Sequence, residues 1–262
     1  MIKRLPYAWL ILWFGIAVLS KLFFHHSFDH SLSHTLEQSS ATHLFGFDAF
    51  GRDLLATTLQ ASKLSAVIAL LTTVLCGFFA LSIGGFMAMA PENFRFIFQR
   101  VLEGFLAFPS LLLALSWSAI RGPGWDTLIV SLALGILPSF SRLVFVRARE
   151  ILSEDYITAA HALGAGPLRI FFFHLTPALA SLCAIKIPGL FAYALLAEAT
   201  LSFLGVGAPI GHDTWGSLLA QGNDYLIEAP HLALGSGIPL VLTILSLQLI
   251  SEAFASKTPS GN

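Results

Sequence analysis

"LSAVIALLTTVLCGFFALSIGGFMAMA", residues 64 to 90, contains no charged side chain. An α-helix needs about 20 predominantly apolar residues to cross the ~30 Å hydrocarbon core of a bilayer, and it satisfies its backbone polar groups internally. The stretch therefore predicts a membrane-spanning helix. Small residues recur along it at four-residue spacing, which predicts a face that a neighbouring helix approaches closely: Cys76, Ala80, Gly84 and Ala88.

The composition agrees with lipid as the main solvent of this protein. Of its 262 residues 56% are hydrophobic and 11% are charged, and the mean hydropathy is +0.78, whereas soluble domains carry about 25% charged residues. Stretches almost free of charge predict an all-α, polytopic membrane protein with about six transmembrane helices, at 7–24, 64–90, 104–120, 127–146, about 178–201 and 232–251.

The basic residues indicate the orientation of these spans. An even number of spans places both termini on one side of the membrane, and most lysines and arginines fall on that side. The positive-inside rule makes this side cytoplasmic. The two groups are Lys3, Arg4, Arg95, Arg100, Arg142, Arg147, Arg149, Arg169 and Lys257, against Lys21, Arg52, Lys63 and Arg121.

The first apolar run resembles a signal peptide in its position, but "FFHHSF" (23 to 28) contains no small-residue cleavage site. We therefore expect an uncleaved anchor helix. The chain then divides into an N-terminal anchor with an extracytoplasmic loop, residues 1–63, and a five-helix core, residues 64–262.

A polar interruption, "SEDYITAAHALGAGPLR" (153 to 169), predicts a short helix between two spans. Ser153 is a good N-cap, carboxylates occupy the first turn, and Gly164 provides a stop, so the helix should cover about 154–163. Its apolar face is narrow and made mainly of small side chains, at Tyr156, Ala159, Ala160 and Leu163. Such a face predicts close approach by another surface; the alternative is an ordinary connector packed on its own bundle.

The stretch "YITAAHALGAGPLRIFFFHLTPA" resembles the cytoplasmic loop signature of ABC importer permeases, a pattern of E-A-A, three residues, G, nine residues and I-x-L-P. Three positions depart from the pattern: Thr158 stands for Glu, His174 for Ile and Thr176 for Leu. The Ala-Ala-x-x-x-Gly spacing and the final proline agree, through Ala159, Ala160, Gly164 and Pro177. The resemblance implies that the loop 147–177 carries a coupling helix, which lies in a groove of a cytoplasmic ATPase subunit.

Two further stretches resemble the peptide/nickel branch of these permeases, and its second (C-type) transmembrane subunit. "LFGFDAFGRDLLA" (44 to 56) is similar to a segment just before the second span, and "AEATLSFLGVGAPIGHDTWGSLLAQG" (197 to 222) to a segment after the fifth. An arginine flanked by carboxylates can form a charge-assisted network. The resemblance implies a role at the extracytoplasmic mouth or a subunit interface for Asp48, Gly51, Arg52, Asp53, Trp215 and Gly216; the alternative for the first four is a solvated turn that begins the next helix.

The resemblance also implies partners and a location. We expect a type I importer fold in a bacterial inner membrane, in contact with lipid, a second permease subunit that differs from this chain, two cytoplasmic ABC ATPases and an extracytoplasmic solute-binding protein. ATP and Mg²⁺ would bind the ATPases, so this chain is expected to hold no cofactor. The net charge of −1 gives no indication of a nucleic-acid partner.

Two ionisable residues fall in or at the edge of the fifth predicted span, where charges are costly and indicate function. Lys186 and Glu198 would be ~18 Å apart along one helix, too far to pair. We expect Glu198, near the outer end, to reach the interface. Lys186 lies deeper, so it should face the translocation path, a partner subunit or a carboxylate such as Glu103; the alternative is snorkelling to the cytoplasmic surface.

His26, His30 and His34 would share one face of a helical loop, a spacing compatible with metal ligation. Aligned histidines in a polar loop are more often simply polar, so we expect no metal site. Cys76 and Cys183 lie inside spans, where a structural disulfide is not expected.

Motifs for catalysis are absent from the sequence, including G-x-x-x-x-G-K-[ST], H-E-x-x-H and G-x-S-x-G. We therefore expect a transporter subunit rather than an enzyme. The alternative is a self-contained ion-coupled carrier or channel, but such proteins carry carboxylates near the middle of their spans and discontinuous helices in paired halves. The resemblance leaves the cargo open among peptides, nickel and related compounds.

Overall fold

The computed structural model describes residues 4–23, 34–207 and 211–256. Within these ranges the secondary structure is helical apart from one isolated bridge between Phe47 and Asp53. The elements are α1 (Leu5–Phe23), α2 (Leu54–Met89), α3 (Glu92–Leu106), α4 (Ser110–Arg121), α5 (Trp125–Leu152), α6 (Asp155–Ala162), α7 (Pro167–Ile170), the π-helical turn η3 (Phe171–Leu175), α8 (Thr176–Phe203), α9 (Trp215–Asp224) and α10 (Pro230–Ala255).

The predicted all-α, multi-span architecture is confirmed. Four helical segments of the described chain are long and apolar enough to cross a bilayer, namely α2, α5, the segment Pro167–Phe203 and α10. The pair α3 and α4 makes a fifth if it is counted as one broken span, and α1 is a shorter apolar helix over Leu5–Ser20. These elements correspond in order to the six predicted spans.

The third predicted span, 104–120, is wrong in detail. The chain forms α3 and α4 instead, and their axes bend by 81°. α3 begins well before residue 104, but four charged side chains lower its hydropathy and hide it from a search for apolar runs. The bend falls at Pro109, which precedes α4 and disfavours a helical conformation at Phe108.

Two further boundaries differ from the prediction. α2 begins at Leu54, so the predicted division between residues 63 and 64 falls inside a helix. The start is fixed by Asp53, whose Oδ1 accepts a hydrogen bond from the Ala56 N–H (2.9 Å) and caps the helix. α9 was not predicted; Thr214 and Ser217 form a capping box at its start.

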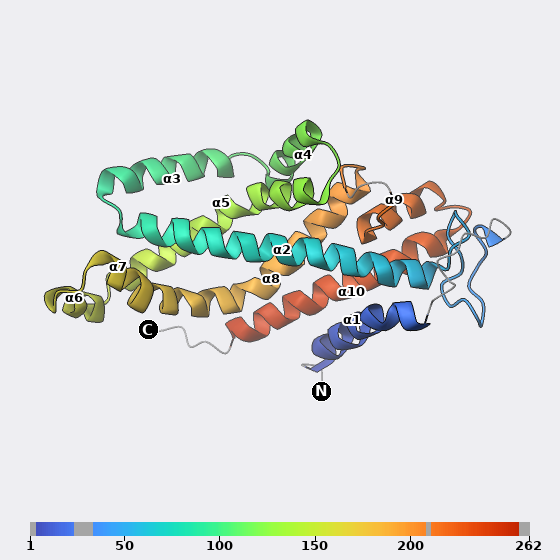
Figure 1. Ribbon diagram of the computed structural model, residues 1–262, viewed down its shortest axis with the longest axis horizontal. Helices are drawn as coiled ribbons and strands as arrows, with labels where there is room; N and C mark the ends of the chain where they lie inside the picture. Colours follow the sequence, from blue (N-terminus) through green and yellow to red (C-terminus); the bar gives the residue numbers. More distant parts are fainter. Residues whose placement is uncertain (1–3, 24–33, 208–210, 257–262) are drawn as a thin grey trace.

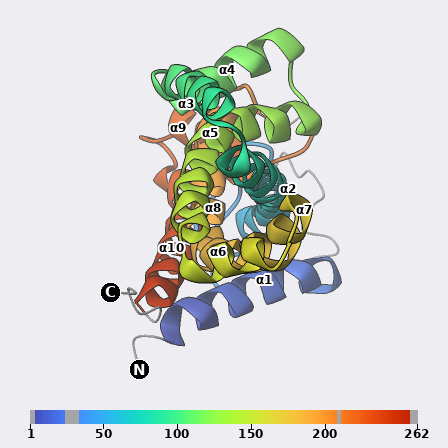
Figure 2. The same ribbon diagram turned by 90° about the vertical axis from the view of Figure 1, so that its left-hand side faces the viewer.

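The long helices run along the longest axis of the molecule, with α2 in front of α5 and α8 in the view of Figure 1. α6 and α7 lie at one end of this axis. The loop that leads into α2 lies at the opposite end together with α9 (Figures 1 and 2). The stretch with the coupling-loop signature therefore lies at one end of the helix bundle, and the stretches around Arg52 and Trp215 lie at the other.

Close packing of α2 against α5 holds the centre of this bundle. Cys76, Ala80, Gly84 and Ala88 are all buried, as the four-residue stripe predicts. A Cβ atom built on Gly84 would lie 2.8 Å from the Ser141 carbonyl oxygen, so the two backbones touch at that point. Helices in lipid gain little from the hydrophobic effect, and such van der Waals contact is what associates them.

We predict that Gly84→Leu destabilises the protein, because an added side chain must separate α2 from α5. Overpacking of a well-packed core costs about 1 to 3 kcal/mol. The variant should lower the midpoint of thermal unfolding of the purified protein, measured by size-exclusion chromatography after heating.

Gly77→Leu is the matched control, because it lies on the same helix and a Cβ at that position has nothing within 4 Å. If both variants lowered the midpoint equally, helix propensity rather than the α2–α5 contact would explain the loss.

Candidate functional site

The end of the bundle that carries α6 is built from the polar interruption between two spans. α6 covers Asp155–Ala162, within about a residue of the predicted helix. The predicted N-cap is wrong: Ser153 ends α5, where its Oγ donates a hydrogen bond to the Glu150 carbonyl oxygen (2.6 Å). Glu154 occupies the N-cap position of α6 without a side-chain hydrogen bond to the helix.

α6 is attached to its own bundle by a residue outside the predicted stripe. Ile157 is 2% exposed and is the one buried residue of the helix. Of the predicted stripe, Tyr156 is 48% and Leu163 89% exposed, and Ala159 is exposed with them. The apolar stripe therefore faces away from the bundle, which the ordinary-connector interpretation does not explain; Thr158 is exposed and Ala160 half-buried.

Gly164 ends this segment in the left-handed conformation, with φ +84°. The N–H of Ala165 donates to the Ala160 carbonyl oxygen (3.0 Å) and that of Gly164 to the His161 carbonyl oxygen (2.9 Å). This pair of bonds is the Schellman motif, which favours glycine at its left-handed position. A Cβ on Gly164 would meet nothing within 4 Å, so the residue is open to a partner surface.

Exposed apolar side chains continue from α6 into α7 and η3. Leu168, Phe172 and Phe173 are all more than half exposed. His174 lies in η3, its ring 6.3 Å from that of Tyr156, and Pro177 lies in the first turn of α8. The end of the bundle thus presents a connected apolar surface, which we call the coupling face: Tyr156, Ala159, Leu163, Leu168, Phe172 and Phe173.

At the other end of the bundle, Asp48 and Arg52 form a buried charge pair. Asp48 is 1% exposed, and its Oδ1 accepts hydrogen bonds from the backbone N–H groups of Phe50 (2.9 Å) and Arg52 (2.8 Å). Arg52 Nε donates to Asp48 Oδ2 at 2.7 Å. The Gly51 N–H donates to the Asp48 carbonyl oxygen (3.1 Å), so the turn is closed on itself.

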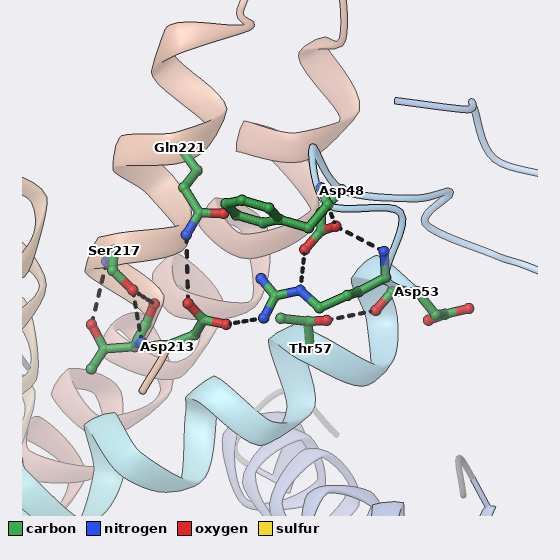
Figure 3. A network of polar contacts seen from close by, with 9 residues as sticks. Asp48, Asp53, Thr57, Asp213, Ser217 and Gln221 are labelled. Carbon is green, nitrogen blue, oxygen red and sulfur yellow. Dashed lines mark hydrogen bonds and ion pairs between the residues drawn. The ribbon is translucent and has the colours of Figure 1, made fainter. Parts of the chain in front are cut away.

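The same arginine reaches across to the segment before α9. Arg52 Nη1 donates to Asp213 Oδ2 at 2.7 Å, and Gln221 of α9 contacts the other oxygen of Asp213 (Figure 3). Burial lowers the pKa of Arg52, but the charges of Asp213 and Asp48 and their hydrogen bonds outweigh it, so the pKa is raised from its ordinary value. The guanidinium therefore stays charged and joins two segments that are distant in sequence.

Asp53 caps the start of α2 and contacts a histidine. It does not pair with Arg52; besides capping α2, its Oδ2 lies 2.7 Å from His43 Nδ1. The ring of His43 packs against Phe47, with centroids 4.4 Å apart.

Trp215 and Gly216 lie at the start of α9 and pack inward. Trp215 is fully buried, and its backbone N–H donates to Ser65 Oγ of α2 (3.1 Å). A Cβ on Gly216 would approach the Ala199 Cα of α8 to 2.7 Å, so α9 rests directly on that backbone. Both residues fix the position of α9.

The two ionisable residues of α8 have opposite environments. Glu198 does not reach an interface; it is fully buried, and its Oε1 accepts a hydrogen bond from Ser202 Oγ (2.7 Å). Lys186 is exposed. Glu103 pairs with Arg100 (2.7 Å) and not with Lys186.

The histidine prediction can be followed at one position. His26 and His30 lie outside the described residues, and His34 contacts Glu37 (3.0 Å). Among the residues that the structure describes, no group of three histidine, cysteine or acidic side chains could hold a metal ion.

Asp213 was missed by sequence reasoning because its partner Arg52 is 161 positions away. The hydrogen bond between the hydroxyl groups of Ser110 and Tyr193 (2.7 Å) was missed for the same reason. The one available signal for the contact between Arg52 and Asp213 was that the stretches 44–56 and 197–222 were both predicted on the extracytoplasmic side.

Comparison with known proteins agrees with this arrangement. Residues 80–258 match the family described as binding-protein-dependent transport system inner membrane component. A putative peptide transport system permease protein from Brucella suis is 39% identical over 210 residues, which are 80% of this chain and 71% of the relative.

More distant relatives have related names. A di/tripeptide transport system permease protein from Pseudomonas aeruginosa is 32% identical over 217 residues, 83% of this chain and 72% of the relative. A glutathione transport system permease protein from Pectobacterium atrosepticum is 30% identical over 217 residues, 82% of this chain and 72% of the relative.

The family match covers more than half of the chain, and the relatives align along most of their own length. The chain therefore belongs to the inner membrane components of binding-protein-dependent transport systems, the multi-pass permease subunits of ABC importers.

Proposed function

We propose that this chain forms half of the translocation path of an ATP-driven importer of di- and oligopeptides. The support for this cargo is the names of the relatives, which are peptide, di/tripeptide and glutathione permeases. A second permease of different sequence would supply the other half, and a solute-binding protein would deliver the peptide. Two ATPase subunits would bind ATP and Mg²⁺, so this chain holds no cofactor of its own.

The observation that carries the proposal is the exposed coupling face. A short helix whose apolar side points away from its own bundle needs a partner to cover it, because exposed apolar patches mark interaction sites. α6 would lie in a groove of the ATPase, with Gly164 allowing close approach. Movement of the ATPases would then be transmitted to α5 and α8, which flank the loop 147–177.

The charge network at the opposite end would serve the extracytoplasmic mouth. Arg52 joins the turn before α2 to the segment before α9 through Asp48 and Asp213. A mouth held in one shape by buried charge pairs is suited to docking of a binding protein or of the second permease. The excess of basic residues on the side of α6 supports cytoplasmic termini.

Reconstitution tests the proposal as a whole. Proteoliposomes are prepared with this chain, its second permease and its ATPases. They should take up a radiolabelled tripeptide when ATP is inside the vesicles, on the side of the ATPases, and peptide-loaded binding protein is outside. Uptake by this chain alone, driven by an ion gradient, would favour the carrier alternative.

We predict that Gly164→Val abolishes association with the ATPase while the protein remains at normal abundance in the membrane. A positive φ is strained for a β-branched residue, by roughly 1 to 2 kcal/mol, and the added bulk would hold the two surfaces apart. Co-purification of the ATPase and peptide-stimulated ATP hydrolysis measure the effect.

Gly122→Val is the matched control. Gly122 also has a positive φ (+81°) with nothing within 4 Å of an added Cβ, but it follows α4, away from α6. Gly122→Val carries the same backbone strain as Gly164→Val. Because the strain lies away from α6, association of this variant with the ATPase should be retained. Normal coupling in Gly164→Val would show that the loop is only a connector.

We predict that Arg52→Gln destabilises the mouth, because Asp48 would remain buried without its partner charge. Removing one partner of a buried pair costs about 3 to 5 kcal/mol. The variant should lower the thermal midpoint of the assembled transporter and expose the segment 34–53 to protease added from outside.

Arg121→Gln provides the comparison, since the Arg121–Asp126 pair is exposed and 3.5 Å long. Exposed pairs contribute between 0 and about 1 kcal/mol, so this change should leave both measurements unaltered. An equal effect of the two variants would argue against a special role of the buried network.

A further inference from the structure

A groove lies between α5 and α8, about halfway along the bundle. Its volume is about 320 Å³, and Ser139 and Leu143 of α5 face Leu190 and Tyr193 of α8 across it. Toward the mouth the groove is closed by the hydrogen bond between Tyr193 and Ser110, where a Cβ on Gly135 would lie 2.7 Å from the Ser110 carbonyl oxygen.

Two cations continue the walls of this groove toward the end that carries α6. Arg142 follows Ser139 at i+3 on α5, and Lys186 precedes Leu190 at i−4 on α8, so each lies on the same helix face as a lining residue. Both are exposed, and neither forms a hydrogen bond or ion pair with another residue that the structure describes.

The two cations also lie at similar depth. Each is roughly 25 Å along its helix from the outer end, at Trp125 for α5 and at Phe203 for α8. Counted against a hydrocarbon core ~30 Å thick, this depth lies in the half of the bilayer nearer to α6. Among the residues that the structure describes, no acidic side chain lines the groove, and Glu198 of α8 is buried closer to the mouth.

A charged side chain there avoids lipid by facing a water-filled cavity or a partner, or by extending to the interface on the side of α6. Two such cations, one beside each wall, create a positive potential in the groove, which attracts anions. A peptide presents one anionic group whatever its side chains are, namely its terminal carboxylate. Arginine and lysine both bind carboxylates through charge-assisted hydrogen bonds.

We propose that this groove, lined by Ser139, Leu143, Leu190 and Tyr193 and continued toward α6 by Arg142 and Lys186, is the wall of the translocation path contributed by this chain. Arg142 and Lys186 bind the terminal carboxylate of the peptide as it passes, and the hydroxyl groups of Ser139 and Tyr193 contact its backbone. The inference rests on the proposed function and adds the position and chemistry of a substrate site.

Thiol labelling tests the potential of the groove without any peptide. In the assembled transporter, with both native cysteines removed (Cys76→Ala and Cys183→Ala), Ser139→Cys is exposed to anionic and cationic methanethiosulfonate reagents of similar size. The anionic sulfonate should react about fivefold faster or more, because two unit charges lie within one or two helix turns.

Adding Lys186→Gln and Arg142→Gln should remove this preference, while Leu245→Cys, on the exposed face of α10, should react slowly with both reagents. Slow labelling of Ser139→Cys by both reagents would mean that the groove is dry, and equal fast labelling that it is not positively charged. Either result overturns the inference.

A transport assay distinguishes two possible partners of the cations, namely the carboxylate of the substrate and a carboxylate of the second permease. Lys186→Gln with Arg142→Gln should lower tripeptide uptake at least tenfold, while co-purification of the second permease and ATP hydrolysis stimulated by loaded binding protein stay within about twofold. Lys186→Arg with Arg142→Lys should retain uptake.

Loss of the second permease from the neutral variant would mean that the two cations pair with that subunit, and unchanged uptake would mean that they bind nothing in transit. Both outcomes overturn the inference. If the unmodified transporter itself takes up no tripeptide, the proposed function fails instead, and the labelling result still reports on the groove.

Discussion

The structure depends on the backbone contact between α2 and α5. In hydrocarbon, helices associate through close packing rather than through the hydrophobic effect, so a glycine that lets two backbones touch has a large influence. At Gly84 the space for even one methyl group is occupied by the Ser141 carbonyl oxygen. α2 starts at Asp53 of the mouth and α5 ends at Ser153 beside α6, so this contact joins one end of the molecule to the other.

The two ends of the bundle use different chemistry. At the mouth, charged groups pair with one another, as in the Asp48–Arg52–Asp213 chain, in which Asp48 is buried and the other two are partly exposed. At the other end, apolar groups are exposed, as in Leu163 and Phe173. Buried charge pairs fix geometry, whereas exposed apolar side chains gain free energy only when a partner covers them. The mouth is therefore held together by contacts within the chain, whereas the end with α6 leaves its apolar side chains uncovered.

Much of the fold could be predicted because lipid imposes a simple rule on the sequence: long uncharged runs such as 64–90 are helices. The rule failed at α3, where Arg95, Arg100 and their neighbours interrupt the apolar pattern of a real helix. It was silent on α9, which is short and mixed in character. Local capping signals were informative at Gly164 but misleading at Ser153, since the same residue types end one helix and begin the next.

Within the candidate sites, only the contacts between residues close in sequence could be predicted. Asp48 and Arg52 are four residues apart and their pairing was expected, whereas Asp213 joins them through the tertiary fold. The burial of Glu198 depends on Ser202 and on the packing of α9, which no span prediction contains. Positions along a helix can be counted from the sequence, but the face that a partner helix covers is decided by packing.

Because Ile157 is the one buried residue of α6, the exposed side chains around it have a consequence for the cell's handling of subunits made in excess. A copy without its partners displays Leu163, Phe172 and Phe173 together at one end of the molecule. Chaperones and proteases act on transiently exposed apolar surface of this kind. The exposed apolar surface at this end would thus distinguish an unassembled subunit from one whose surface a partner covers.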